Sequence, residues 1–243
     1  MLIVLFIIGF FGNVIGTLAG GGGLITLPTM LLLGMPVHSA IGANKVANTV
    51  STLSSIFTVF RRKEVTLKEV TPILILCFSG GLLGGALASL FSEQTLTIVA
   101  ICLLVFALFL SFLGKTDFGD QLQLQIKKKT ATLLVGIGIY DGLFGPGSGT
   151  LLLYLYANEK IAYMKAVLLG RVGIFATCFG AALMYIFSGQ IIWSQTFALM
   201  IGSIVGSQLG IQIARKVSAK LAKYLLRLIT AILIGQLIME LFT

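Results

Sequence analysis

The sequence predicts an all-α polytopic membrane protein made of two inverted repeats, each with four apolar blocks. The chain is 57% hydrophobic and only 10% charged, whereas soluble domains average about 25% charged residues. Runs of roughly 20 apolar residues recur along it, and each is long enough to cross a ~30 Å hydrocarbon layer. A Gly-rich break followed by a basic residue inside an apolar segment also occurs twice, before Lys45 and before Arg171.

Polar stretches divide the chain into apolar blocks and mark the boundary between the repeats. The blocks cover roughly 2–33, 40–60, 68–91, 95–113, 130–157, 163–187, 192–214 and 219–242. The only long polar stretch is 114–129. Its charged residues are Lys115, Asp117, Asp120, Lys127, Lys128 and Lys129. We therefore expect a first membrane repeat over 1–113, a cytoplasmic linker over 114–129 and a second membrane repeat over 130–243.

Glycines carry the internal repeat. An offset of 126 residues places the first-block break, Gly20–Gly23, on the fifth-block break at Gly145–Gly149, and Lys45 on Arg171. The third and seventh blocks share a G-x-x-x-G spacing, at Gly80 and Gly84 and at Gly202 and Gly206. This spacing lets helix backbones approach closely in lipid. Tight packing within the chain is the favoured interpretation, and a homodimer through these faces is the alternative.

The distribution of charge predicts how the halves are oriented. The basic loops at 61–68, 114–129 and 215–223 should be cytoplasmic, and the loops at 92–94 and 188–195, without Lys or Arg, should lie outside. The second and sixth blocks then cross in opposite directions, so the repeats are inverted. The fifth block must begin and end on the cytoplasmic side, which predicts re-entrant hairpins at both Gly-rich breaks. The alternative is that both blocks are kinked single spans in parallel halves. The expected location is the bacterial inner membrane, as a multi-pass protein.

Three ionisable residues lie inside apolar blocks: Lys45, Arg171 and Asp141. Such residues are costly in a membrane and indicate function by default. Two basic residues at repeat-equivalent positions predict a shared site for a small oxyanion near the midplane. Two alternatives remain open at this stage. Lys45 could snorkel to the surface, and Arg171 could form a structural ion pair with Asp141, which could also serve in coupling.

The neighbours of these charges complete the candidate binding site. Helix N-termini at the Gly-rich breaks offer free N–H groups and partial positive charge, and polar residues beside Lys45 favour a wet helix face. The expected substrate-binding residues are Asn44, Lys45, Asn48, Gly21, Gly22, Gly23, Gly147, Ser148, Gly149 and Arg171.

Several function classes lack support in the sequence. The net charge of +9 comes from basic residues at block ends, so we expect no nucleic-acid partner. Three isolated cysteines and His38 make no metal-ligand spacing, and no catalytic pair or nucleotide-binding loop occurs, so we expect no enzyme, metal or cofactor. A membrane assembly subunit and a cation carrier using Asp141 are the alternatives to an anion transporter.

The first repeat resembles the sulfite exporter TauE/SafE family. The similarity lies in Gly16–Pro28, Gly34–Pro36 and Ala40–Lys45, and the second half repeats the pattern less faithfully. The resemblance implies an inner-membrane permease that exports sulfite or a small organosulfonate such as sulfoacetate.

Overall fold

The structure is a computed structural model of the chain. It describes residues 1–20, 22–61, 64–96, 98–99, 102, 117–217, 221 and 224. This part of the chain is helical, as predicted, and its only β-bridge joins Gln121 to Ile161. The fourth and eighth predicted blocks lie largely outside the described residues, and Gly21 lies outside them as well. The helices are α1 (Leu2–Ala19), α2 (Gly23–Leu32), α3 (Val37–Arg61), α4 (Leu67–Ser89), α6 (Lys128–Leu143), α7 (Ser148–Asn158), α8 (Tyr163–Phe187) and α9 (Trp193–Ala214).

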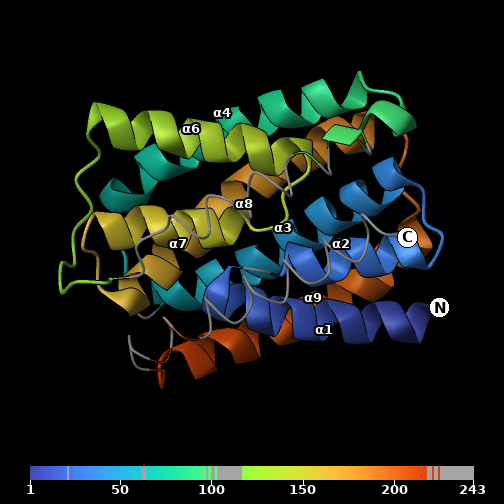
Figure 1. Cartoon of the computed structure of the whole chain (residues 1–243). Coiled ribbons are helices and arrows are strands. Elements are labelled where there is room, and N and C mark those ends of the chain that lie inside the picture. Colours follow the sequence, from blue (N-terminus) through green and yellow to red (C-terminus); the bar gives the residue numbers. More distant parts are fainter. Residues whose placement is uncertain are drawn as a thin grey trace.

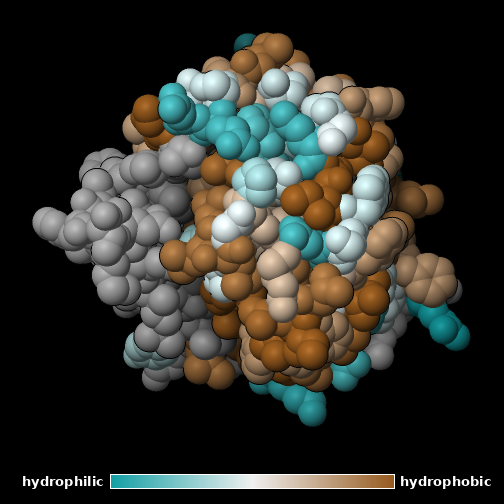
Figure 2. Space-filling view, turned by 90° about the vertical axis from the view of Figure 1, so that its right-hand side faces the viewer, coloured by the Kyte–Doolittle hydropathy of each residue, from teal (hydrophilic) through white to brown (hydrophobic). Residues whose placement is uncertain are grey.

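The long helices form one bundle in which they lie side by side (Figure 1). Helices α1, α4, α8 and α9 are long and apolar enough to cross a membrane. Helix α3 has 25 residues but carries a polar stripe that includes Asn44, Lys45 and Asn48. Figure 2 looks onto one end of the bundle, where hydrophilic residues gather across the upper middle and hydrophobic ones occupy the lower and right edges. This distribution fits a bundle whose sides face lipid.

The first predicted block forms two antiparallel helices, α1 and α2, rather than one kinked helix. Gly20 ends α1 in the left-handed conformation, with φ 73°, and its N–H donates to the carbonyl of Gly16. The chain then turns back, so that Gly22 lies against Gly16 and Thr26 lies against Gly12. A side chain at Gly12 or Gly16 would collide with α2, because the two helices touch through these glycines.

The fifth block has the same form, because α6 and α7 also run antiparallel. Ser148 contacts Asp141 near the turn, and Thr130 at the start of α6 donates to Glu159, which follows the end of α7. Two glycines in the left-handed region, Gly145 and Gly147, make the turn. In Figure 1, α2 turns back toward the N-terminal end of α1, whereas α7 turns back toward the opposite side of the bundle.

The G-x-x-x-G glycines bring helices of the two halves together. A side chain at any of them would collide with a backbone carbonyl of the neighbouring helix. The carbonyls belong to Val135 and Ile139 of α6 for Gly80 and Gly84, and to Phe6 and Phe10 of α1 for Gly202 and Gly206. Tight packing within the chain, the interpretation that the sequence favoured, is therefore confirmed. Each of these four glycines contacts a helix of the same chain.

These contacts also refine the correspondence between the halves. The offset of 126 relates the bounds of α3 to those of α8. It would pair Val135 with Gly9 and Ile139 with Asn13. The carbonyl contacts instead pair Val135 with Phe6 and Ile139 with Phe10. The first helices of the two halves, α1 and α6, therefore correspond with a shift of about one helical turn from the offset of 126, since a turn contains about 3.6 residues.

Candidate functional site

The tips of the two helix pairs meet in the middle of the bundle. Gly20 at the end of α1 lies directly against the backbone of Gly149, and a Cβ built at Gly23 would sit 3.3 Å from Cα of Pro146. Thr150 of α7 donates a hydrogen bond of 2.8 Å to the carbonyl of Ala19. Because backbone meets backbone here, the tips leave no room for side chains.

A small cavity lies beside these tips. Its lining comes from α1, α2, α3, α6, α7, α8 and the two turns, and comprises Asn13, Gly16, Gly20, Gly22, Gly23, Asn44, Asn48, Asp141, Gly145, Ser148, Gly149, Arg171, Ile174 and Cys178. Seven of these are among the ten expected substrate-binding residues, and an eighth, Asp141, was predicted as a coupling or ion-pair residue. A second, smaller cavity is bordered by Leu153, Val167 and Gly170, and it shares five lining residues with the first: Gly16, Gly20, Gly149, Arg171 and Ile174.

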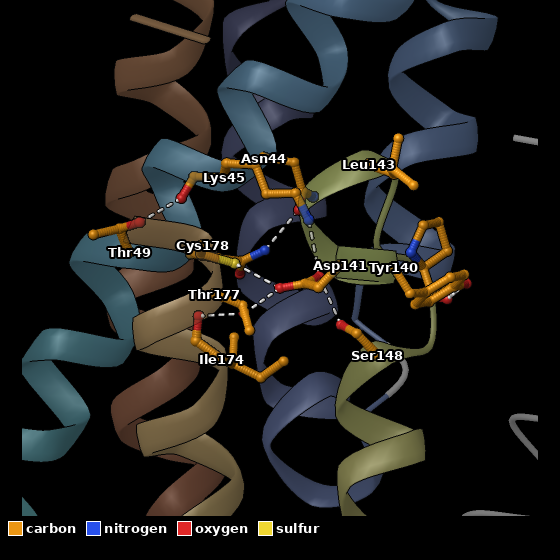
Figure 3. A network of polar contacts seen from close by, with 12 residues as sticks. Asn44, Lys45, Thr49, Tyr140, Asp141, Leu143, Ser148, Ile174, Thr177 and Cys178 are labelled. Carbon is orange, nitrogen blue, oxygen red and sulfur yellow. Dashed lines mark hydrogen bonds and ion pairs between the residues drawn. The ribbon is translucent and has the colours of Figure 1, made fainter. Parts of the chain in front are cut away.

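Asp141 lies at the centre of a network of donors (Figure 3). Its Oδ1 accepts hydrogen bonds from Lys45 Nζ at 2.8 Å and from Ser148 Oγ at 2.7 Å. Its Oδ2 accepts from the hydroxyl of Thr177, and Cys178 Sγ lies 3.5 Å from it. The carboxylate therefore has partners on α3, α7 and α8, and it is satisfied as an anion without any ligand.

This network decides two alternatives that the sequence left open. Lys45 does not snorkel to the surface, since it is only 1% exposed and its ammonium group bonds Asp141. The alternative in which Arg171 forms an ion pair with Asp141 is wrong, because Asp141 pairs with Lys45. Gly145 makes this possible, because any side chain there would collide with Lys45 Nζ. Lys45 and Gly147 are not among the residues that line the cavity.

Arg171 is a buried cation that pairs with no carboxylate in the part of the chain that the structure describes. Its Nη2 donates to Ser207 of α9 and lies 3.5 Å from the hydroxyl of Ser55 on α3. Its Nε is buried and has no hydrogen-bond partner within the described part of the chain. The sequence agrees with this lack of an acidic partner among the described residues: the first acidic residue of the chain is Glu64, so α1, α2 and α3 contain none, and α9 contains none either.

Three asparagines, Asn13, Asn44 and Asn48, also line the cavity, and hydroxyl groups hold two of them. Asn48 donates to Asn44 at 2.6 Å, and Asn44 donates to the hydroxyl of Thr26 on α2. Ser51 donates to the side-chain oxygen of Asn13 at 3.1 Å.

Two helix N-termini also face each other at this place. The backbone N–H groups of Gly23 and Leu24 in α2, and of Gly149 and Thr150 in α7, make no hydrogen bonds between described residues. Free N–H groups in the first turn of a helix carry partial positive charge and favour anions. The site therefore brings a guanidinium group, amide donors and two helix N-termini together around one small cavity.

Sequence reasoning missed the hydroxyl groups that hold the charges. Ser55, Ser207 and Thr177 are ordinary in membrane helices, and nothing local distinguishes them. One signal was available on α3, where Asn44, Asn48 and Ser55 share a face at helical spacing with Lys45 beside them. For Ser207 and Thr177 no comparable pattern exists, because their partners come from other helices.

Membrane-length helices around a small polar cavity fit a multi-pass membrane protein of the transporter class. The chain belongs to the sulfite exporter TauE/SafE family, whose sequence profile matches residues 5–237. It is a membrane transporter located in the cell membrane.

Relatives with assigned names are similar over most of their length. A "Probable membrane transporter protein" of Haemophilus influenzae is 33% identical over 217 residues, which are 84% of this chain and 82% of that protein. The "Probable membrane transporter protein ORF9" of a Sinorhizobium species is 31% identical, over 84% of this chain and 80% of its own. The "Probable membrane transporter protein YfcA" of Escherichia coli is 28% identical, over 83% and 76%. No solved structure matches this chain.

Proposed function

We propose that this transporter exports a small anion, sulfite or a small organosulfonate such as sulfoacetate, bound near the membrane midplane between the hairpin tips. The observation that carries the proposal is Arg171, a cation that is 5% exposed, lines the cavity and lacks a carboxylate among the described residues. A buried charge without a partner is strongly disfavoured. A bound anion would supply the missing charge.

The proposal includes two inverted repeats with re-entrant hairpins. Contacts between the halves support it, because they occur in matching pairs. Ser39 donates to the carbonyl of Gln190 at 2.6 Å, and Lys165 donates to that of Glu64 at 3.1 Å. With an offset of 126, Ser39 is equivalent to Lys165 and Glu64 is equivalent to Gln190. The two contacts are therefore equivalent to each other, with the two halves in exchanged positions. These contacts lie at the ends of α3 and α8.

The alternative functions have less support. A cation carrier would need a carboxylate free to bind the ion, but Asp141 accepts from Lys45, Ser148 and Thr177. An assembly subunit would need no polar cavity at the meeting point of two Gly-rich turns. Export rather than uptake is the favoured direction, because an inside-negative potential drives an anion outward by about 2.3 kcal/mol per charge per 100 mV.

Transport into proteoliposomes tests the proposal. Purified protein is placed in liposomes that contain Ellman's reagent, whose disulfide is cleaved by entering sulfite with release of a coloured thiolate. An inside-positive potential should accelerate entry, and radiolabelled sulfoacetate serves as the second substrate. If neither anion enters faster than in protein-free liposomes at any potential, the proposed function is wrong.

Variants of Arg171 then test the site. Hydrogen bonds to charged groups are worth about 1.5–3 kcal/mol, so Arg171→Gln should raise KM roughly ten- to hundredfold. Arg171→Lys should also weaken transport, because an ammonium group cannot reproduce the planar guanidinium donors. Wild-type KM in both variants would exclude Arg171 from the binding site.

A further inference from the structure

We propose that Ser55 and Ser207 are positioning residues that hold the Arg171 guanidinium in its anion-binding orientation. This inference rests on the proposed function and names residues of the same site. The two hydroxyls come from different helices, α3 and α9, and they contact each other as well as Nη2 of Arg171. Arg171 itself belongs to α8, so three helices meet at one guanidinium nitrogen.

Both hydroxyls are themselves held in place. Ser55 Oγ and Ser207 Oγ each lie 3.1 Å from the backbone carbonyl of Ser51. The two serines are also 0% exposed, so water does not compete for their oxygens. A fixed acceptor pair restricts where Nη2 can lie, and because the guanidinium group is planar, it also restricts Nε. Orientation of this kind lowers the entropy that must be lost when an anion binds.

The other half of the molecule lacks this arrangement. An offset of 126 residues relates α3 to α8, so the position equivalent to Ser55 is Ala181. An offset of 122 residues relates α4 to α9, so the position equivalent to Ser207 is Gly85. Gly85 and Ala181 do pack against each other, with 2.9 Å between a Cβ built on Gly85 and Cα of Ala181. The equivalent contact therefore exists, but it carries no hydroxyl. At these two equivalent positions, hydroxyls are therefore present on the Arg171 side and absent on the other, where Lys45 pairs instead with the carboxylate of Asp141.

This asymmetry has a functional consequence. Asp141 neutralises the charge of Lys45. The acceptors that hold Arg171 are neutral hydroxyls, so they leave the positive charge of Arg171 uncompensated. The anion then binds on the Arg171 side of the interface rather than midway between the two cations. Serine suits this role because its oxygen accepts a hydrogen bond without adding negative charge.

The test measures sulfite transport by Ser207→Ala, Ser55→Ala and the double variant in proteoliposomes. KM should rise about tenfold for Ser207→Ala and further for the double variant, since one hydrogen bond to a charged group is lost with each. The maximal rate should change little, because the serines act on binding. Ser203→Ala is the matched control: Ser203 lies one turn earlier on α9, is 1% exposed, and its hydroxyl has no partner within the described residues.

A double-mutant cycle separates positioning from simple packing. In an Arg171→Lys background, Ser207→Ala should have no further effect on KM, because the group that it positions is gone. Melting temperature in detergent with and without sulfite is the second readout, and Ser207→Ala should reduce the shift that sulfite causes. If Ser207→Ala does not fold, Ser55→Ala is carried through the same cycle.

The outcomes distinguish this inference from the proposed function. Wild-type protein that does not transport sulfite or sulfoacetate would overturn both. Wild-type transport whose KM is raised by Arg171→Gln as expected, together with serine variants equal to Ser203→Ala, would overturn the positioning role alone. Equal effects of Ser207→Ala in the wild-type and Arg171→Lys backgrounds would also overturn it.

Discussion

At the scale of residues, the two buried cations have different roles. Lys45 bonds a carboxylate and is absent from the cavity lining, whereas Arg171 lines the cavity and, among the described residues, bonds hydroxyls only. Removing one partner of a buried ion pair costs about 3–5 kcal/mol, whereas removing both is often nearly neutral. The Lys45–Asp141 pair is therefore expected to behave as a structural clamp between α3 and α6.

Asp141→Asn alone should leave Lys45 buried without a counter-charge and should reduce the stability by about 3–5 kcal/mol. The double variant Lys45→Gln with Asp141→Asn should recover most of that loss and still transport sulfite. Melting temperature in detergent and proteoliposome uptake measure the two effects. A double variant as unstable as Asp141→Asn, or stable but inactive, would contradict the clamp.

At the scale of elements, the hairpin tips depend on glycine for two reasons that can be separated. Gly20 and Gly34 both adopt positive φ, 73° and 79°, so alanine is strained at either. Only Gly20 also meets another backbone, that of Gly149, while a Cβ at Gly34 would meet nothing within 4 Å. The two positions therefore share the strain but differ in the contact between tips.

Gly20→Ala should separate the tips and abolish transport, because the new Cβ would overlap the peptide between Gly149 and Thr150. Gly34→Ala should lower stability by about 1–2 kcal/mol through backbone strain and leave the transport rate near that of wild type. Initial rates and membrane expression levels are compared for both. Similar activity of the two variants would show that the contact between tips is dispensable.

At the scale of the whole molecule, the arrangement of helices predicts the membrane topology. Helix α9 connects two opposite ends of the bundle (Figure 1). Single cysteines at Ser188 and Arg215, introduced after replacement of the native cysteines, should therefore label from opposite faces. A cysteine at Asn158, at the end of α7, should react from the same face of the membrane as a cysteine at Arg215. Labelling of intact cells with an impermeant maleimide is the measurement, and reaction of Asn158→Cys from outside would exclude the re-entrant second hairpin.

The two ends of the bundle are joined with different strength. At one end Glu64 pairs with Arg215 at 2.6 Å and Lys165 pairs with Glu69 at 2.7 Å. The counterpart of the Lys165–Glu64 contact, from Ser39 to Gln190, is a neutral hydrogen bond. The ion pairs are partly buried, so solvent screens them less than an exposed pair.

Glu64→Gln should consequently lower the stability by on the order of 1 kcal/mol, after allowance for partial exposure. The difference from wild type should shrink in high salt. Asp117→Asn is the control, because the Lys160–Asp117 pair is exposed, with side-chain exposures of 54% and 73%, and should change little. Equal melting temperatures of Glu64→Gln and wild type at low salt would contradict the expectation.

The sequence by itself determined the helical membrane class, the Gly-rich breaks and the buried charged residues. These are local properties: an apolar run of sufficient length, a cluster of glycines or a charge inside an apolar segment is visible in a short window. The bounds of α8 agree with the predicted block 163–187, and eight expected residues line the cavity. The chain also showed that no acid precedes Glu64.

Only the tertiary structure decided which charges meet. Asp141 is closer in sequence to Arg171 than to Lys45, yet it pairs with Lys45, whose ammonium group fits beside α6 because Gly145 has no side chain. The partners of Arg171 come from α3 and α9, which no local pattern connects. The shift of about one turn between α1 and α6 likewise appears only in helix contacts. Pairing depends on how helices pack across the chain, and that packing is set by many weak contacts at once rather than by any one segment.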